Sequence, residues 1–327
     1  MTNSKNMVLG VALGDAYGVG IEFQDRDWIL HNVDFTKYVN KREGKQGINY
    51  ESGFYSDDAE HTIGLMKALM SREPYSEELL LRYWKNEYDS DKLEKGFGRQ
   101  GHGGIKDWYE GKLSVKELQD LQRNREDPGN APTMRAVPLG YVNSSKINEY
   151  AIINANSTHP NQQAIDASIL VARAAEYMLV KREDQNQIIK YCKNFVEEKH
   201  TLELLTRTDL IGNPEYLSED EFEILCGPQP IPFLASQGKI LKGLPCSSLK
   251  TAVSALYIIK HSKDAFTGLK QSINFGGDVD SLAAICTGIL GGIYGLESLP
   301  SFMLEKLEGK SKLEKLAAEF DKYVETQ

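Results

Sequence analysis

The sequence predicts an all-α fold in a single domain, and three observations lead to this expectation. Apolar residues recur at helical spacing in many segments; in residues 59–71, for example, the pattern falls on Ile63, Met66 and Leu69. No stretch alternates apolar and polar residues for more than a few positions, as a half-buried strand would. With 327 residues, of which 41% are hydrophobic, the chain is long enough to bury many helices in one large domain.

The individual helices can be predicted in order along the chain. Ser114 with Glu117, and Ser218 with Glu221, have the form of capping boxes, so a helix is expected after each serine. Residues 24–54 show no sustained period, and residues 95–104 are rich in glycine; both segments are expected to be loops. Further helices are expected over residues 7–16, 59–71, 76–88, 164–181, 184–199, 249–261, 266–274, 282–294 and 305–324.

The least helical part of the sequence is residues 206–245, which contain five prolines. Such a segment could mark a domain boundary. We expect instead a long connection inside one domain that spans residues 1–327, because clusters of acidic residues on its two sides are chemically alike. No fixed-period repeat or low-complexity linker divides the chain.

The stretch that organises the rest is residues 274–295, where two carboxylates precede an apolar helix. Gly276 and Gly277 allow the backbone to fold tightly around something bound. Asp280 or Ser281 is expected to cap the helix. The helix is apolar on nearly every face and is therefore buried. Because Asp278 and Asp280 lie at the mouth of a buried helix, they are costly unless they are paired, hydrogen-bonded or bound to a metal.

A second acidic cluster, formed by Ser56, Asp57 and Asp58, also lies at a predicted helix start. Each cluster offers two carboxylates and a hydroxyl, without a nearby Cys, and such hard oxygen ligands suit Mg²⁺ or Mn²⁺ better than zinc. If the two helix starts face each other, four carboxylates could hold two cations. The alternative is that the clusters are two independent helix caps, because Asp pairs are common there.

Composition excludes several classes of function. The net charge of −9 argues against a surface for duplex nucleic acid, which needs clustered Lys and Arg. The four cysteines include no CxxC pair, which indicates reduced thiols and a cytoplasmic protein rather than a disulfide frame. The N-terminus is not a convincing signal peptide, and the apolar stretch after Ser281 is shorter than the ~20 residues that cross a membrane.

Five segments in a fixed order, from about residue 8 to about residue 296, carry a resemblance to a known family. They read Gly-Asp-Ala-Tyr-Gly from residue 14, followed by Glu22; Tyr-Ser-Asp-Asp from 55; Gly-Asn-Ala-Pro-Thr-Met-Arg from 129; Ser-Thr-His-Pro from 157; and Gly-Gly-Asp-Val-Asp-Ser from 276. Each alone is unspecific. Together they resemble the ADP-ribosylglycohydrolase family.

The resemblance implies an all-α domain with two divalent cations, Mg²⁺ more than Mn²⁺, in a central cleft. It implies hydrolysis of the bond between C1″ of ADP-ribose and an acceptor, either a protein or a small molecule, with ADP-ribose as product. Glu22, Asp58 and Asp280 are the candidates for catalysis, without a choice among them for the base. The metal ligands implied by position are Ser56, Asp57, Asp58, Asp278, Asp280 and Ser281.

Substrate-binding residues are also implied. The loop at residues 98–104 resembles the family's glycine-rich loop, whose backbone N–H groups can approach a pyrophosphate. It lacks the acidic residue of the arginine-specific bacterial type, and so looks more like the loop of relatives that act on O-linked ADP-ribose. Without the resemblance, residues 98–104 would be interpreted as a surface loop, Met134 as a core side chain, Arg135 as a partner in a salt bridge and His159 as a histidine at a helix start. The residues implied are Gly101, His102, Gly103, Asn130, Met134, Arg135 and His159.

Three other functions are weighed against this one. A non-catalytic ADP-ribose-binding protein on the same fold is the main alternative, although both Asp pairs and Glu22 are present. A prenyl-diphosphate type of enzyme would need an Asp-Asp-x-x-Asp helix, and the segment after Asp57 and Asp58 lacks the third Asp. Cleavage of a phosphoester by the same two metals is a weaker enzymatic alternative.

Overall fold

Two helices packed backbone against backbone form the centre of the molecule, α1 (Lys5–Gly18) and α16 (Val279–Tyr294). The computed structural model describes residues 4–39, 51–213 and 216–326. Gly10 and Gly14 make the contact possible: a Cβ atom there would lie 2.4 Å from the carbonyl oxygen of Thr287 and 2.2 Å from that of Ala283. Any side chain at either position would push the two helices apart.

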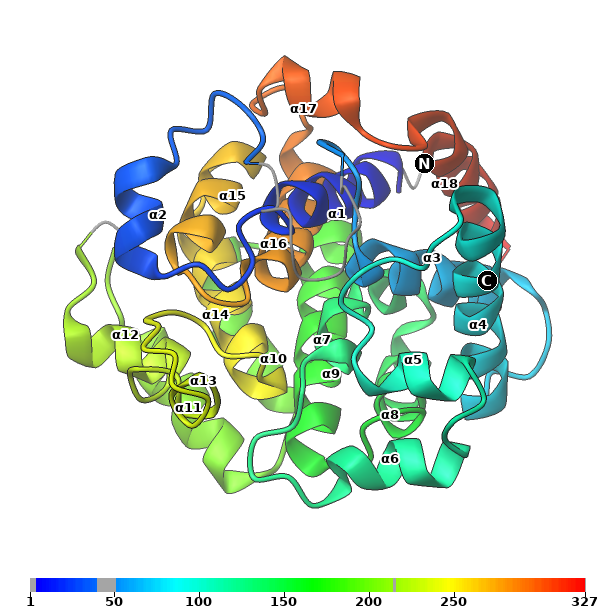
Figure 1. The fold of residues 1–327 in the computed structure, drawn as a ribbon, viewed down its shortest axis with the longest axis horizontal. Coiled ribbons are helices and arrows are strands. Elements are labelled where there is room, and N and C mark those ends of the chain that lie inside the picture. The colour runs from blue at the N-terminus through cyan, green and yellow to red at the C-terminus, as the bar shows by residue number, and fades with distance from the viewer. Residues whose placement is uncertain (1–3, 40–50, 214–215, 327) are drawn as a thin grey trace.

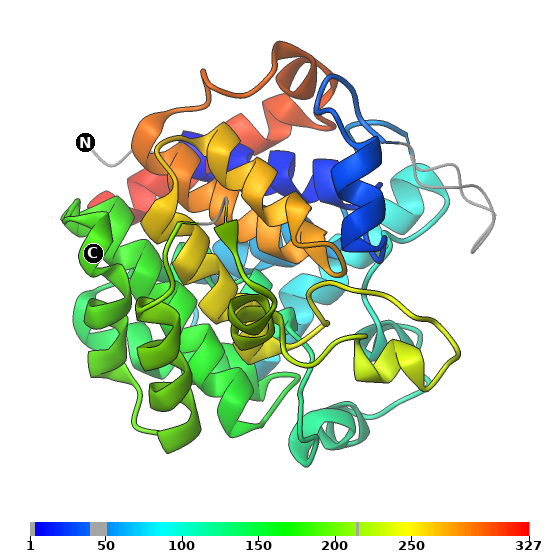
Figure 2. The same ribbon diagram turned by 90° about the vertical axis from the view of Figure 1, so that its left-hand side faces the viewer.

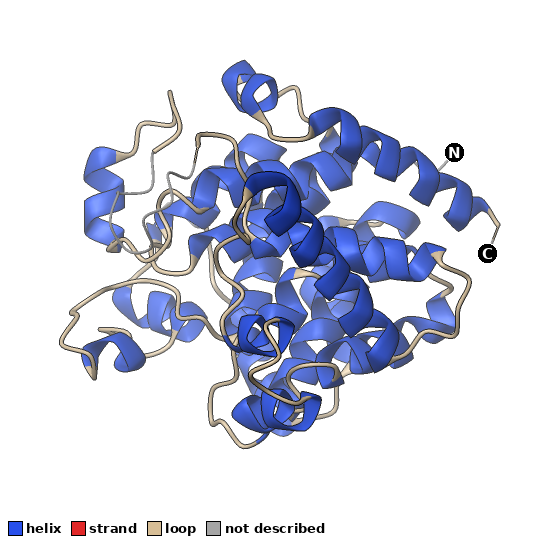
Figure 3. Cartoon of the chain, turned by 45° about the vertical axis from the view of Figure 1, so that its right-hand side comes forward, coloured by secondary structure: helices blue, strands red, loops and turns tan. Residues whose placement is uncertain are grey.

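Other helices surround this pair, and within the described residues no β-strand is present (Figure 3). The all-α prediction is therefore confirmed. The helices are α2 (Arg26–Asn32), α3 (Asp57–Met70), α4 (Glu77–Lys95), α5 (Gly104–Tyr109), α6 (Val115–Arg123), α7 (Ala131–Met134), α8 (Ile147–Asn156), α9 (Gln162–Ala175), α10 (Ile188–Cys192), α11 (Lys199–Asp209), α12 (Glu219–Cys226), α13 (Pro232–Ala235), α14 (Ser248–His261), α15 (Ala265–Asn274), α17 (Ser301–Lys306) and α18 (Lys310–Glu325).

The arrangement places the N-terminus of α16 in the middle of the protein. In Figure 1, α15 and α14 lie beside α16 on one side, while α3 and α4 lie on the other side of α1. Figure 2 shows α9 and its neighbours as a further group below this centre, with α18 across the top. One connected hydrophobic core includes residues from α1 through α18, as a single domain requires. None of the described helices combines the length and apolar character that crossing a bilayer needs.

Both predicted capping boxes are present. Ser114 accepts a hydrogen bond from the N–H of Glu117, and Ser218 accepts one from the N–H of Glu221. In each case the glutamate carboxylate accepts from the backbone N–H of the serine, so helices α6 and α12 begin where the sequence indicates.

Some local predictions were wrong. Residues 184–199 are not one helix: Asp184 bonds the N–H of Asn186 in a tight turn, Val196 is extended, and Glu198 caps α11 through the N–H of Thr201. Local capping by acidic side chains therefore interrupts the apolar period. Helices α5 and α8 were missed, and residues 206–245, the least helical part of the sequence, contain α13 in addition to the predicted α12. Part of the predicted loop at residues 24–54, residues 40–50, lies outside the described residues.

Candidate metal centre

Three carboxylates from three different helices meet beside the α1–α16 contact. Asp15 in α1, Asp58 in α3 and Asp280 in α16 each bring a carboxylate oxygen to within 4.8 Å of the others. Their exposed fractions are 0%, 2% and 4%, respectively. Three buried carboxylates so close together repel one another in a low dielectric, and a bound cation is the usual means of compensating such a group.

Asp15 is the member of this group that the sequence-based list of site residues omitted. One of its oxygens accepts from the N–H of Ser56 and the other from the N–H of Ala59, at 2.8 Å in both bonds. Asp15 thereby binds two backbone groups at the start of α3, where the helix dipole favours negative charge. The signal that could have found it is an aspartate inside an apolar helix, between Gly14 and Gly18.

At the start of α3, Asp58 has one oxygen that is bonded and one that is not. Ser56 caps the helix through the N–H of Asp58, and its hydroxyl donates to Oδ2 of Asp58 at 3.2 Å. Oδ1 of Asp58 is buried without a hydrogen-bond partner among the described residues. A buried carboxylate with one such oxygen, in a group with two further carboxylates, fits a divalent cation.

At the start of α16 the predicted cap is wrong. Asp278 is the N-cap residue but makes no side-chain cap bond, and Asp280 accepts from the adjacent N–H of Ser281 at 3.0 Å. Asp278 and Asp280 are therefore not consumed in capping. The paired glycines also have a structural use: a Cβ atom on Gly277, at φ 75°, would lie 2.1 Å from the carbonyl oxygen of Leu244. They fold tightly against the chain itself.

Two of the predicted substrate-binding residues lie against this helix start. Asn130, at the N-terminus of α7, donates to Oδ2 of Asp278 at 3.4 Å. The thioether of Met134 lies 3.8 Å from the hydroxyl of Ser281. Both side chains are buried, and their contacts with Asp278 and Ser281 hold the start of α16 in place. Direct contact of either side chain with substrate stays a prediction.

Burial and mutual repulsion disfavour ionisation throughout the group. Burial raises the pKa of Asp57 to about 7 and the pKa of Asp15 to about 6. Burial and the charge of Glu22 raise the pKa of Asp278 to about 6. The pKa values of Asp58 and Asp280 are raised well above the usual range by burial and neighbouring carboxylates. A cation would favour the ionised forms and reverse these shifts.

Glu22 lies at the edge of the same group, half-buried, in the turn that follows α1. Its N–H donates to the carbonyl of Gly18, and the next residue, Phe23, donates to the carbonyl of Gly277 at 2.7 Å. The turn is thus anchored to the segment that precedes α16. A cavity of about 700 Å³ is lined by Phe23, the next residue, and by Cys246; its wall combines apolar residues of the segment from α12 to α14 with charged residues of the segment 125–127.

The glycine-rich loop lies over the start of α3. The N–H of Asp57 donates to the carbonyl of Gln100 at 3.1 Å. Gly101 has φ 99°, and a Cβ atom there would lie 1.7 Å from Oδ1 of Asp57. The predicted loop therefore touches the predicted metal ligand directly, and only glycine fits at that contact. Gly101 and Gly103 are exposed.

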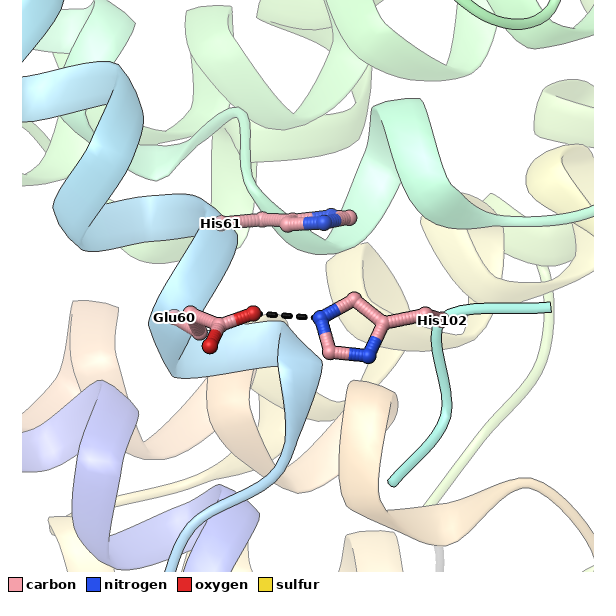
Figure 4. A group of neighbouring side chains, drawn as sticks. All are labelled: Glu60, His61 and His102. Atoms are coloured by element: carbon pink, nitrogen blue, oxygen red, sulfur yellow. Dashed lines mark hydrogen bonds and ion pairs between the residues drawn. The ribbon is translucent and has the colours of Figure 1, made fainter. Parts of the chain in front are cut away.

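His102 belongs to a second group of possible ligands, with Glu60 and His61 (Figure 4). Its Nε2 contacts Oε2 of Glu60, and its Nδ1 donates to the carbonyl of Arg99 at 2.9 Å. Burial by itself lowers the pKa of His102, but the bond to Glu60 outweighs burial and raises it. His102 is buried, and both of its ring nitrogens are bonded to the protein. These bonds do not support the predicted contact between His102 and substrate, which stays a prediction.

Arg135 and His159 are joined through the hydroxyl of Thr158. Arg135 is fully buried, stacks on Trp84, and donates to Asn154 and to the hydroxyl of Thr158 at 2.9 Å. The same hydroxyl contacts Nδ1 of His159 at 2.8 Å. The bonds of Arg135 are thus all within the protein, and substrate contacts of either residue stay predictions.

A sequence comparison decides the family. The model of the ADP-ribosylglycohydrolase family matches residues 3–327. The chain belongs to the ADP-ribosylglycohydrolase family. The resemblance carried by the five segments is thereby confirmed, and with it the expected enzyme class, a hydrolase of the ADP-ribosylglycohydrolase type.

Relatives within the ADP-ribosylglycohydrolase family are distant but match along nearly the whole chain. ADP-ribosylhydrolase ARH3 of Mus musculus is 23% identical over 96% of this chain and 89% of its own length. ADP-ribosylarginine hydrolase Tri1 of Pseudomonas putida is 21% identical over 98% of this chain and 79% of its own length. A solved structure, the ADP-ribosylglycohydrolase-related protein complex, covers 98% of this chain with a TM-score of 0.67 and 18% identity, which supports the fold.

Proposed function

We propose that this protein is a divalent-metal-dependent hydrolase that cleaves the C1″ bond between ADP-ribose and an acceptor. The observation that carries the proposal is the convergence of Asp15, Asp58 and Asp280 in a buried cluster, where no described residue forms a hydrogen bond with Oδ1 of Asp58. A catalytic site for this reaction must stabilise positive charge on the ribose ring and activate a water. A cluster of carboxylates with cations can do both.

Two divalent cations, Mg²⁺ before Mn²⁺, are the proposed cofactors. When bound, they would hold ribose hydroxyls and lower the pKa of a water. The residues that would hold them are Asp15 together with Ser56, Asp57, Asp58, Asp278, Asp280 and Ser281. Hard oxygen donors without Cys in the cluster favour Mg²⁺ or Mn²⁺ over zinc.

Glu22 is the candidate for proton transfer. It is half-buried at the rim of the cluster, and its charge acts on the pKa values of both Asp278 and Asp280. A carboxylate at such a rim can accept a proton from a water and remain in contact with solvent to release it. Asp58 and Asp280 would then serve chiefly to hold the cations and stabilise the ring charge.

The ADP portion of the substrate would extend away from the cluster. The glycine-rich loop with Gly101 and Gly103 is exposed beside Asp57 and offers a backbone surface to the pyrophosphate. The cavity of about 700 Å³ has the size and partly apolar lining typical of small-molecule sites, and it is lined by Phe23, the residue after Glu22. The product would be free ADP-ribose.

An O-linked acceptor, on a protein or a small molecule, is favoured over an arginine-linked one. The glycine-rich loop carries Arg99, Gln100 and His102 but no acidic residue that could pair with a guanidinium. Relatives named for hydrolysis of ADP-ribosylarginine are nevertheless among those that match the chain. We place the reaction in the cytoplasm, because the four cysteines are all free.

A non-catalytic ADP-ribose-binding protein on this fold remains the alternative function. Such a protein would need neither the buried carboxylates nor Glu22, whose mutual repulsion costs stability. Retention of all of them argues for catalysis.

The deciding experiment is release of ADP-ribose from serine-linked, O-acetyl and arginine-linked substrates, each with Mg²⁺ and with EDTA. We expect release that disappears with EDTA, and faster from the O-linked substrates. Binding of ADP-ribose without release from any substrate would support the binding protein instead. Release that EDTA leaves unchanged would exclude the metal-dependent mechanism.

A further inference from the structure

A buried pair of titratable side chains, Glu60 and His102, joins the glycine-rich loop to α3 two residues beyond Asp58. Glu60 and His102 are 2% and 6% exposed and bond to each other directly (Figure 4). The other ring nitrogen of His102 donates to the carbonyl of Arg99, so the imidazole also closes the loop on itself. One side chain thus holds the loop at two points.

Arg99 extends this connection to three further segments. Its guanidinium donates to the carbonyl of Tyr55 at 2.7 Å, to Glu308 at 2.8 Å, and pairs with Asp91 of α4. It also stacks on the ring of Tyr55, 3.7 Å from the ring centre. The residues on both sides of Gly101 are therefore anchored, and each anchor leads to a different element of the fold.

Between these two anchors the loop contacts the metal centre. Gln100 accepts the hydrogen bond from the N–H of Asp57, and Gly101 approaches its carboxylate too closely for any side chain. Gly101 and Gly103 allow many backbone conformations, so without anchors the loop would not be held against the carboxylate of Asp57. The position of the Asp57 carboxylate and the position of the loop are therefore determined together.

We propose that Glu60, His102 and Arg99 form a clamp that positions the glycine-rich loop against Asp57 and so sets the geometry of the metal centre. The proposal rests on the proposed function, since it concerns the same site. Glu60 and His102 are positioning residues in this account: they act through Asp57 and touch neither substrate nor cation.

The same residues do not form a second metal site. His61, the third member of the group, contacts the hydroxyl of Tyr109 at 3.0 Å through Nε2 and the guanidinium of Arg135 at 3.4 Å through Nδ1. The guanidinium of Arg99 lies 3.9 Å from Glu60. These two guanidinium groups, beside histidine nitrogens that are already bonded, would repel a cation.

The clamp can be tested with Glu60→Gln, His102→Gln and the double variant, each of which removes at least one of the two titratable groups and so weakens the connection. The matched control is Glu176→Gln, which removes an equally buried carboxylate whose partners Arg173, Ser144 and Tyr191 belong to neither the loop nor the metal centre. If one single variant does not fold, the other breaks the same bond from the opposite side.

Two measurements are informative. Amide hydrogen exchange, read on peptides that cover Asp57 and residues 98–104, should be about tenfold faster in each clamp variant, as expected for the loss of a hydrogen bond to a charged group. The affinity for Mn²⁺, measured by electron paramagnetic resonance, should fall by about 10–100-fold, as for other residues that support metal ligands. If both single substitutions act on the same bond, the double variant should change exchange and Mn²⁺ affinity no more than the single variant with the larger effect.

Unchanged exchange in the loop, or Mn²⁺ affinity equal to that of the Glu176→Gln control, would overturn the clamp. So would a loss of ADP-ribose binding in His102→Gln that Glu60→Gln does not share, because this difference would mean direct contact with the ligand. A wild-type protein that binds no Mn²⁺ would count against the proposed function, and the exchange measurement would still decide whether the clamp holds the loop.

Discussion

Helix α3 contributes to two groups of possible metal ligands, through Asp58 to the first and through Glu60 and His61 to the second, and only the first has the character of a metal site. In the first, Asp58 joins Asp15 and Asp280, all three are acids, and one buried oxygen has no partner among the described residues. In the second, Glu60 joins His61 and His102, and two buried arginines lie beside the group: the guanidinium of Arg135 contacts Nδ1 of His61, and that of Arg99 lies 3.9 Å from Oε1 of Glu60, which like Oδ1 of Asp58 has no hydrogen-bond partner among the described residues.

The difference shows that short distances between ligand atoms do not define a metal site. What matters is whether lone pairs are still available and what charge surrounds them. The first group consists of three buried carboxylates and has excess negative charge, which the charge of Arg99 offsets only in part at Asp15. In the second group, neighbouring arginines compensate the negative charge, and its hydrogen bonds hold the surrounding chain in one geometry.

Substitution Asp280→Ala should have the largest effect on this comparison. It removes a carboxylate of the first group, so Mn²⁺ affinity and EDTA-sensitive turnover should fall by more than the about 10–100-fold typical of residues that only support ligands. The fold should be retained, because the removed charge repels Asp15 and Asp58. Circular dichroism and a Mn²⁺ titration check this. Asp166→Ala, at a buried aspartate of α9, is the control. Undiminished turnover in Asp280→Ala would exclude the site.

Substitution Glu22→Gln should affect turnover more than binding. If Glu22 transfers a proton, kcat should fall by about 10²–10⁴-fold, whereas ADP-ribose and Mn²⁺ should bind as in the wild type. Single-turnover kinetics together with calorimetry separate these quantities. Complete loss of ADP-ribose binding would instead mean that Glu22 positions the ligand or a metal, and its catalytic assignment would fail.

The metal-free protein should lose stability as pH rises. The folded pKa values of about 6 for Asp15 and Asp278 and about 7 for Asp57 exceed the ordinary value of 3.8. The folded state therefore binds protons at these carboxyls more tightly than the unfolded state does. This contribution to the free energy of unfolding is complete below about pH 4 and is lost as pH rises through 6 and 7. Melting temperatures with EDTA should fall between pH 4 and 8, and Mg²⁺ should restore more of the loss at pH 8 than at pH 5. A flat EDTA profile would contradict the raised pKa values.

Substitution His61→Gln should change the metal centre least. His61 lies in the second group but does not bond to the glycine-rich loop, so Mn²⁺ affinity should match that of the wild type. The buried bond to Tyr109 is lost, and the free energy of unfolding should fall by about 1–3 kcal/mol. Chemical denaturation and a Mn²⁺ titration on the same sample test both statements. A lost Mn²⁺ equivalent would mean that the second group binds metal after all.

Much of this protein could be predicted from the sequence, where the signal is local. The apolar periods and the capping serines Ser114 and Ser218 determine where helices begin, because capping involves residues only a few positions apart. The same holds for the two acidic helix starts at Asp57 and Asp278. The family motifs then indicated the enzyme class, because their order along the chain is itself a sequence property.

Other features depended on which segments meet in space. Asp15 enters the metal centre because Gly10, Gly14 and Gly18 bring α1 into backbone contact with α16, and no local pattern reveals the partner of a glycine face. His102 could be assigned to the glycine-rich loop, yet only the fold supplies Glu60, 42 positions away, as its partner. The sequence alone thus determined the helices and the chemistry they carry, and the tertiary packing decided which carboxylates stay unpaired.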